Sequence, residues 1–122
     1  MSLKNTDNII HELSFNFAVR IVKFYQHLTE CKKVYVLSKQ ILRCGTSIGA
    51  NVRESEHAAS TADFVSKLTI ALKEADETQY WLELLHETDI INDNEYNSLS
   101  NDVKQIIGTL VKIIKTTKAS TK

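Results

Sequence analysis

The sequence predicts an all-α protein, an antiparallel up-down-up-down four-helix bundle. Apolar residues recur at steps of three and four in four successive segments, which is the spacing of amphipathic helices. The 122 residues include no proline and only three glycines, too few turn residues for an all-β sandwich or a turn-rich α/β fold. With 43% hydrophobic and 25% charged residues, the chain has the composition of one ordinary folded domain spanning residues 1–122.

The first two helices are expected near residues 8–28 and 33–57, because the stretch 29–32 interrupts the apolar pattern. Steps of three and four keep each apolar row on one side of a helix with 3.6 residues per turn. The row of the first helix comprises Ile10, Leu13, Phe17, Ile21, Phe24 and Leu28, and that of the second comprises Val34, Leu37, Ile41, Cys44, Ile48 and Val52.

The last two helices are expected near residues 61–88 and 93–117, and each follows a capping signal. Ser60 precedes Asp63 by three residues, and Asn92 precedes Glu95 in the same way. Short connections make neighbouring helices antiparallel. The third row comprises Phe64, Leu68, Ala71, Ala75, Thr78, Leu82 and Leu85, and the fourth comprises Tyr96, Leu99, Val103, Ile106, Leu110 and Ile113.

Apolar side chains outside these rows predict a homo-oligomer. A helix that is apolar around most of its circumference is buried on more than one side, and one bundle core covers only one side. The alternative interpretation is a wide core stripe with ordinary scattered exposure. The residues outside the rows are Phe15, Ala18, Val19, Val22 and Tyr25 on the first helix, and Ile70, Trp81 and Leu84 on the third.

The net charge of zero conceals a segregation of charge along the chain. Residues 13–53 carry +6, residues 74–103 carry −9 and residues 104–122 carry +5. On the second helix, four basic residues fall within about 80° of one another, opposite the core row. This stripe is either a surface for phosphate groups or a solvated helix face, and the acidic third helix either pairs with a neighbouring subunit or is solvated. The stripe comprises Lys32, Lys39, Arg43 and Arg53.

Neither catalysis nor metal binding is expected. Ser47 lies in a Gly-x-Ser-x-Gly pattern, but a nucleophile elbow needs a strand before the serine, and this segment reads as helix. Gly45 and Gly49 flank the core row instead, where small residues let another backbone approach. Glu54-x-x-His57 and Glu83-x-x-His86 fit a di-iron pattern, yet they fall at opposite ends of the bundle, ~37 Å apart. We therefore expect no catalytic residue, no metal and no cofactor.

The sequence also predicts a cytoplasmic protein outside the membrane. The first eight residues contain no apolar core of a secretory signal, and no window approaches the ~20 apolar residues of a membrane span. Cys31 and Cys44 are the only cysteines, and we expect both to be free thiols.

One run of the second helix carries a resemblance to a known family. The run from Arg43 to Glu54 reads R-C-G-T-S-I-G-A-N-V-R-E, and its group of small residues is not required by a generic bundle. With the residues that follow, through Asp63-Phe64 and as far as Trp81-Leu82, it resembles the small bacterial four-helix-bundle proteins encoded in intervening sequences of 23S ribosomal RNA genes. The accessory protein of diversity-generating retroelements is similar. The family commonly has glycine after the motif glutamate, where this chain has Ser55.

The resemblance implies a homopentamer that binds nucleic acid through a basic face and, in the retroelement relative, also engages a reverse transcriptase. By motif position it selects Arg43 and Arg53 as nucleic-acid contacts. It implies structural roles for Ser47, Asn51 and Glu54, as helix-to-helix hydrogen bonds or interface contacts. Gly45, Gly49, Phe15, Val22 and Trp81 complete the expected set of interface and structural residues.

Three functions remain open. The first is a non-enzymatic, oligomeric bundle that binds structured RNA or DNA by its phosphates. The second is an interaction scaffold that docks a partner protein, such as a reverse transcriptase, without touching nucleic acid. The third is a metal-dependent bundle enzyme.

Overall fold

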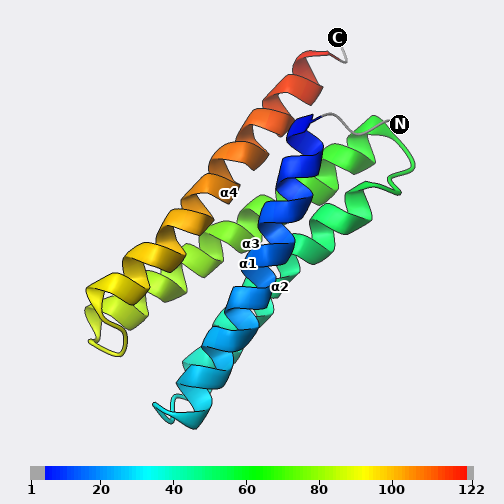
Figure 1. Cartoon of the computed structure of the whole chain (residues 1–122). Helices are drawn as coiled ribbons and strands as arrows, with labels where there is room; N and C mark the ends of the chain where they lie inside the picture. The colour runs from blue at the N-terminus through cyan, green and yellow to red at the C-terminus, as the bar shows by residue number, and fades with distance from the viewer. Residues whose placement is uncertain (1–4, 121–122) are drawn as a thin grey trace.

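The computed structural model describes residues 5–120, within which the chain forms four α-helices and no strand (Figure 1). The helices are α1 (Asn5–Glu30), α2 (Val36–Ser55), α3 (Thr61–Glu87) and α4 (Asp93–Ala119). Each helix packs against the next, and α4 packs against α1, which confirms the antiparallel four-helix bundle. Residues 1–4, part of the segment expected to lack a secretory signal, and residues 121–122 lie outside the described range.

The predicted helix ends lie within three residues of the observed ends. The difference that matters for the site is the start of α2, which begins at Val36 rather than at residue 33. Lys33 adopts a φ of 59°, in the left-handed region, where a right-handed helix cannot continue. No helix within residues 5–120 combines the length and the apolar character that a membrane span requires.

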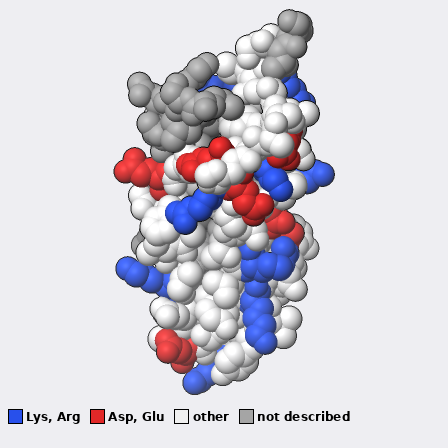
Figure 2. Space-filling view, turned by 90° about the vertical axis from the view of Figure 1, so that its right-hand side faces the viewer, with Lys and Arg blue, Asp and Glu red and all other residues white. Residues whose placement is uncertain are grey.

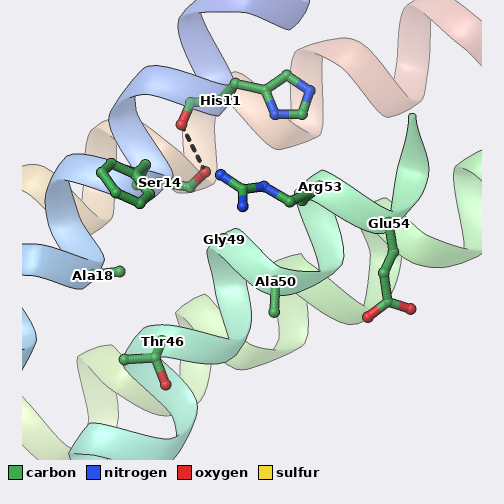
Figure 3. Close-up of a pocket in the computed structure, with 9 residues that line it drawn as sticks. His11, Ser14, Ala18, Thr46, Gly49, Ala50, Arg53 and Glu54 are labelled. Carbon is green, nitrogen blue, oxygen red and sulfur yellow. Dashed lines mark hydrogen bonds between the residues drawn. The ribbon is translucent and has the colours of Figure 1, made fainter. Parts of the chain in front are cut away.

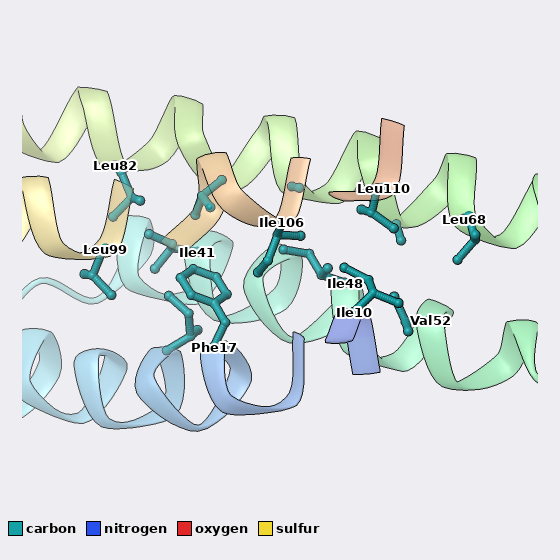
Figure 4. Packing of buried hydrophobic residues seen from close by; sticks show 14 of the residues in the cluster. Ile10, Phe17, Ile41, Ile48, Val52, Leu68, Leu82, Leu99, Ile106 and Leu110 are labelled. Atoms are coloured by element: carbon teal, nitrogen blue, oxygen red, sulfur yellow. The ribbon is translucent and has the colours of Figure 1, made fainter. Parts of the chain in front are cut away.

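The four apolar rows meet in one core (Figure 4). The row predicted for the third helix is buried along its whole length. In the other rows, Leu13, Val34, Leu37 and Tyr96 are half-buried and pack against the edge of the core. Ser14 is buried beside Leu13, because α1 and α2 approach closely at that level.

Both predicted caps form, with one difference in detail. The Asn92 side chain accepts a hydrogen bond from the Glu95 amide (2.8 Å), and the Glu95 carboxylate accepts one from the Asn92 amide (3.1 Å). The Ser60 hydroxyl oxygen accepts from the Asp63 amide (3.0 Å), but the Asp63 carboxylate accepts from Ala59 rather than from Ser60. These bonds satisfy amides that the first turn of a helix leaves without partners.

The buried hydroxyl groups are satisfied without water. Most donate to a backbone carbonyl three or four residues earlier in the same helix, as Thr78 does to Glu74 (2.7 Å). Ser100 of α4 donates instead to the side-chain oxygen of Gln79 on α3 (3.0 Å), which joins the two helices. No buried side-chain nitrogen or oxygen of the described residues lacks a hydrogen-bond partner, so the core carries no uncompensated polar group.

Candidate functional site

The two motif glycines lie where α1 and α2 touch. A Cβ atom at Gly45 would lie 2.9 Å from both Cγ atoms of Ile21, and one at Gly49 would lie 3.3 Å from the carbonyl oxygen of Ser14. Carbon atoms at these positions would crowd α1, so glycine permits the close approach of the two helices. The backbone that approaches the small residues is therefore that of α1 in the same chain.

The polar motif residues bond mostly within their own helix. The Ser47 hydroxyl donates to the carbonyl of Arg43 (2.7 Å), and the Asn51 amide nitrogen donates to the carbonyl of Ser47 (2.9 Å). These bonds differ from the helix-to-helix bonds that the resemblance implies for Ser47 and Asn51. Glu54 does reach another helix, since its carboxylate lies 3.4 Å from the ammonium group of Lys67 on α3.

Cys44 is a buried free thiol and Cys31 an exposed one. Burial raises the pKa of the Cys44 thiol from 9.0 to about 11, while a hydrogen bond with Thr78 opposes the shift. A raised pKa keeps Cys44 in its unreactive protonated form at neutral pH.

We expect thiol reagents at pH 8 to modify Cys31 rapidly and Cys44 only when the fold opens. A Cys31→Ser variant should therefore react with far less than one equivalent of reagent when native and with one equivalent in denaturant. Because the unfolded thiol ionises near 9.0 and the folded thiol near 11, the contribution of Cys44 to stability is complete below pH 9 and is lost as the pH rises towards 11. Prompt labelling of the native Cys31→Ser variant would contradict the buried position.

A groove of about 410 Å³ runs between α1 and α2, over the motif (Figure 3). Small residues line much of it, among them Ala18, Gly49 and Ala50. His11, Arg53 and Glu54 also line it, and Figure 3 shows the guanidinium group of Arg53 extending from α2 towards Ser14 on α1. Most side chains of the Arg43–Glu54 motif that point away from the core therefore line this groove.

Two of the predicted basic residues present their charge to solvent. Arg53 is exposed and lies over the ring of Phe15, with the guanidinium carbon 5.9 Å from the ring centroid. Lys39 is exposed as well, and neither residue forms an ion pair with the side chains that the structure describes, those of residues 9–120. They are fourteen positions apart along α2, a rise of about 21 Å.

Arg43 lies on the same face of α2, but its charge is paired with carboxylates of α3. Its guanidinium group forms ion pairs with Glu74 (3.4 Å) and with Glu77. Glu77 also accepts a hydrogen bond from the indole nitrogen of Trp81 (3.0 Å), which fixes the carboxylate. Trp81 is half-buried against the edge of the core. The acidic third helix therefore neutralises this arginine inside the chain.

The prediction that Lys32 belongs to the stripe on α2 is wrong. Lys32 lies before α2, in the connection that runs from the end of α1 to Val36. Its ammonium group donates to the carbonyl of Ile90, in the connection after α3 (2.8 Å). The positive φ of Lys33 turns the chain there, so Lys32 shares no helix face with Lys39. The lysine joins the two connections that lie at one end of the bundle (Figure 1).

The extra apolar residues of α1 form an exposed row, which we call the α1 strip (Phe15, Val19 and Val22). Their side chains are 56%, 41% and 41% exposed. Figure 2 shows the side of the molecule that carries α1 and α2, where uncharged residues form a broad band bordered by lysine, arginine and acidic side chains. A second row, the α3 strip, comprises Ile70, Tyr80, Trp81 and Leu84, with Ile70 and Tyr80 exposed.

Sequence reasoning missed several ion pairs between elements. Arg20 of α1 bonds to Asp102 of α4 (2.5 Å), and His11 of α1 bonds to Glu56 after α2 (2.8 Å). The partners of Arg43 could have been found, because an antiparallel hairpin centred near Ala58 places residues 74–77 opposite it.

The two Glu-x-x-His motifs do not come together. Glu54 and His86 lie near the C-terminal ends of the antiparallel helices α2 and α3, at opposite ends of the bundle. Among the side chains of residues 9–120, which the structure describes, no group of three or more potential metal ligands gathers.

Comparisons with known proteins identify a family that this chain matches. The model of the 23S rRNA-intervening sequence protein family matches residues 6–112. A crystal structure of a protein of unknown function from the S23 ribosomal protein family of Bacteroides thetaiotaomicron is 55% identical, with a TM-score of 0.89. That match covers 90% of this chain and 98% of the crystallised one. No curated protein matches the chain.

Proposed function

The chain belongs to the 23S rRNA-intervening sequence protein family, and from this premise we propose that it is a non-enzymatic, homo-oligomeric, cytoplasmic bundle that binds structured RNA or DNA. The nucleic acid contacts the outer face of α2 through its phosphates, with little dependence on sequence. The assembly is the homopentamer that the family resemblance implies. Two free thiols suit a reducing compartment.

The observation that carries the proposal is the pair of unneutralised cations on one face of α2. Lys39 and Arg53 are exposed, have no acidic partner among the described side chains and lie about 21 Å apart along the helix. Phosphates repeat every several ångströms along a nucleic-acid strand, so this length spans more than one of them. A homo-oligomer repeats the pair in every subunit, which raises avidity without a new contact.

Arg43 can contact a phosphate only after it releases the carboxylates of α3. Its guanidinium group is about half exposed, and a phosphate would have to displace Glu74 and Glu77 to form a bidentate contact. The expected contribution of Arg43 is therefore smaller than that of Lys39 or Arg53.

The test is a titration of a fluorescent structured RNA by anisotropy at about 50 and about 200 mM salt. If the assembled subunits neutralise six or more phosphates, affinity should fall by about a thousandfold or more between the two conditions. Lys39→Glu with Arg53→Glu should weaken binding at low salt by at least about tenfold. The matched control is Lys104→Glu with Lys112→Glu on α4, which makes the same change of net charge and should bind RNA like the unmodified protein.

Two results would overturn nucleic-acid binding: no binding at about 50 mM salt, or equal losses in both double variants. The second of these would show a general effect of net charge rather than a site.

A second function, docking of a partner protein such as a reverse transcriptase, is favoured by the engagement of Arg43 with α3. That pairing lowers the free positive charge on the outer face of α2, while the apolar side chains of the α1 strip are exposed on the neighbouring helix. Under this alternative, the Lys39→Glu, Arg53→Glu variant retains the same partner from nuclease-treated lysate, whereas a charge placed at Val22 releases it.

A further inference from the structure

We propose that copies of the chain associate head to tail, with the α1 strip of one copy packed against the α3 strip of the next. This inference rests on the homo-oligomer of the proposed function and names the two surfaces that form it. The partner is a second copy of this chain.

The α1 strip has the geometry of a helix-packing surface. Its residues are four and three positions apart, so they share one side of α1, away from the buried row that contains Phe17 and Ile21. Ala18 continues the surface into the groove beside α2. Three large apolar side chains that are each more than two-fifths exposed on one helix face indicate a surface that another chain covers.

The α3 strip is a second and different surface. Tyr80 is 57% exposed and meets Trp81 edge to face, with ring centroids 5.1 Å apart. Ile70 is 40% exposed and lies about three turns before Trp81 on the same side of α3. Aromatic residues with one exposed side are frequent anchors of protein interfaces.

The charges beside the two strips select pairing between unlike surfaces. Lys23 is exposed on α1 next to Val22 of the α1 strip, in the segment that carries +6. Asp76, Glu83 and Glu87 are exposed on α3, in the segment that carries −9. Packing α1 on the α1 of another copy would bring like charges together, whereas packing α1 on α3 brings opposite charges together.

The position of the two strips in the fold makes the contact heterologous. Within the described residues, α1 and α3 both pack against α2 and α4 but not against each other, so they stand at opposite corners of the bundle. Each copy thus offers one strip to the neighbour on one side and the other strip to the neighbour on the other side. Such contacts generate a closed ring or an open filament, and they leave the outer face of α2 uncovered between the two interfaces.

The test uses two variants that each block one surface. Phe15→Glu with Val22→Glu places carboxylates on the α1 strip, and Ile70→Glu with Tyr80→Glu places them on the α3 strip. The matched control is Asn101→Glu with Gln105→Glu at exposed positions of α4. Circular dichroism and thermal unfolding confirm that each variant folds, and light scattering after size-exclusion chromatography gives the mass of each sample and of the 1:1 mixture.

We expect the control to assemble like the unmodified protein and each blocked variant to be monomeric, with affinity weakened at least about a hundredfold. The mixture should form a dimer and nothing larger, because it restores one intact α1–α3 contact. Assembly of the α3-strip variant at unmodified affinity would overturn the pairing in favour of α1 on α1, and a mixture that stays monomeric would overturn it too. A monomeric unmodified protein would instead refute the homo-oligomer itself.

Discussion

Replacing Phe17 by alanine is expected to lower the free energy of unfolding by about 3–5 kcal/mol. Phe17 is 1% exposed and lies in the centre of the core, among side chains from all four helices (Figure 4). Truncation removes a large apolar surface and leaves a cavity that rigid neighbouring helices cannot fill. Urea unfolding followed by circular dichroism measures the loss, which should appear as a lower midpoint with an unchanged slope.

The matched control is Phe15→Ala, two residues earlier on the same helix. Its ring is 56% exposed, so the folded single chain should lose less than about 1 kcal/mol. Any greater loss should grow with protein concentration, because it would come from assembly through the α1 strip. Equal losses in the two variants at low protein concentration would contradict the division of α1 into a core face and an outer face.

The core was predictable from the sequence because helical periodicity is a local property. The row from Phe64 to Leu85 is buried without exception, since every step of three or four residues keeps it on one side of α3. The cap at Asn92 was predictable for the same reason, because both of its hydrogen bonds join residues three apart. Helix type and core position thus follow from the order of residues within one segment.

The candidate site was less predictable because its charges depend on contacts between segments. Arg43 lies at the angular position around α2 that predicted a basic stripe. However, its guanidinium group pairs with two carboxylates of α3. Lys32 failed for a conformational reason, since the left-handed residue after it ends the helical register. A helical wheel describes one helix in isolation, whereas the available charge depends on what the neighbouring helix presents.

Replacing Gly45 by alanine is expected to destabilise the protein by about 1–3 kcal/mol, although alanine is the better helix former by ~1 kcal/mol. The new Cβ would lie 2.9 Å from two carbon atoms of Ile21. Ile21 is fully buried and β-branched, so its side chain has almost no alternative rotamer in a helix. The clash must be relieved by moving α1 away from α2, and denaturant unfolding measures the cost.

Gly108→Ala on α4 is the control that separates packing from helix propensity. Apart from its chain neighbours and the backbone of its own helix, no atom lies within 4 Å of a Cβ built there, so the variant should be more stable by about 0.4–1 kcal/mol. Gly49→Ala should fall between the two, because its Cβ meets the Ser14 carbonyl oxygen at 3.3 Å and a backbone atom yields only if the helix shifts. Gains of similar size at all three positions would contradict close packing as the role of the motif glycines.

The same glycine series connects the motif to the outer surface. Moving α1 away from α2 also displaces the α1 strip relative to Arg53, because Phe15 of the strip and Arg53 both line the groove and lie against each other. We therefore expect Gly45→Ala to weaken assembly as well as folding, whereas Gly108→Ala should leave assembly unchanged. If Gly45→Ala lowers stability but assembles with unmodified affinity, the glycines serve the core alone and the spacing of α1 and α2 does not set the interface.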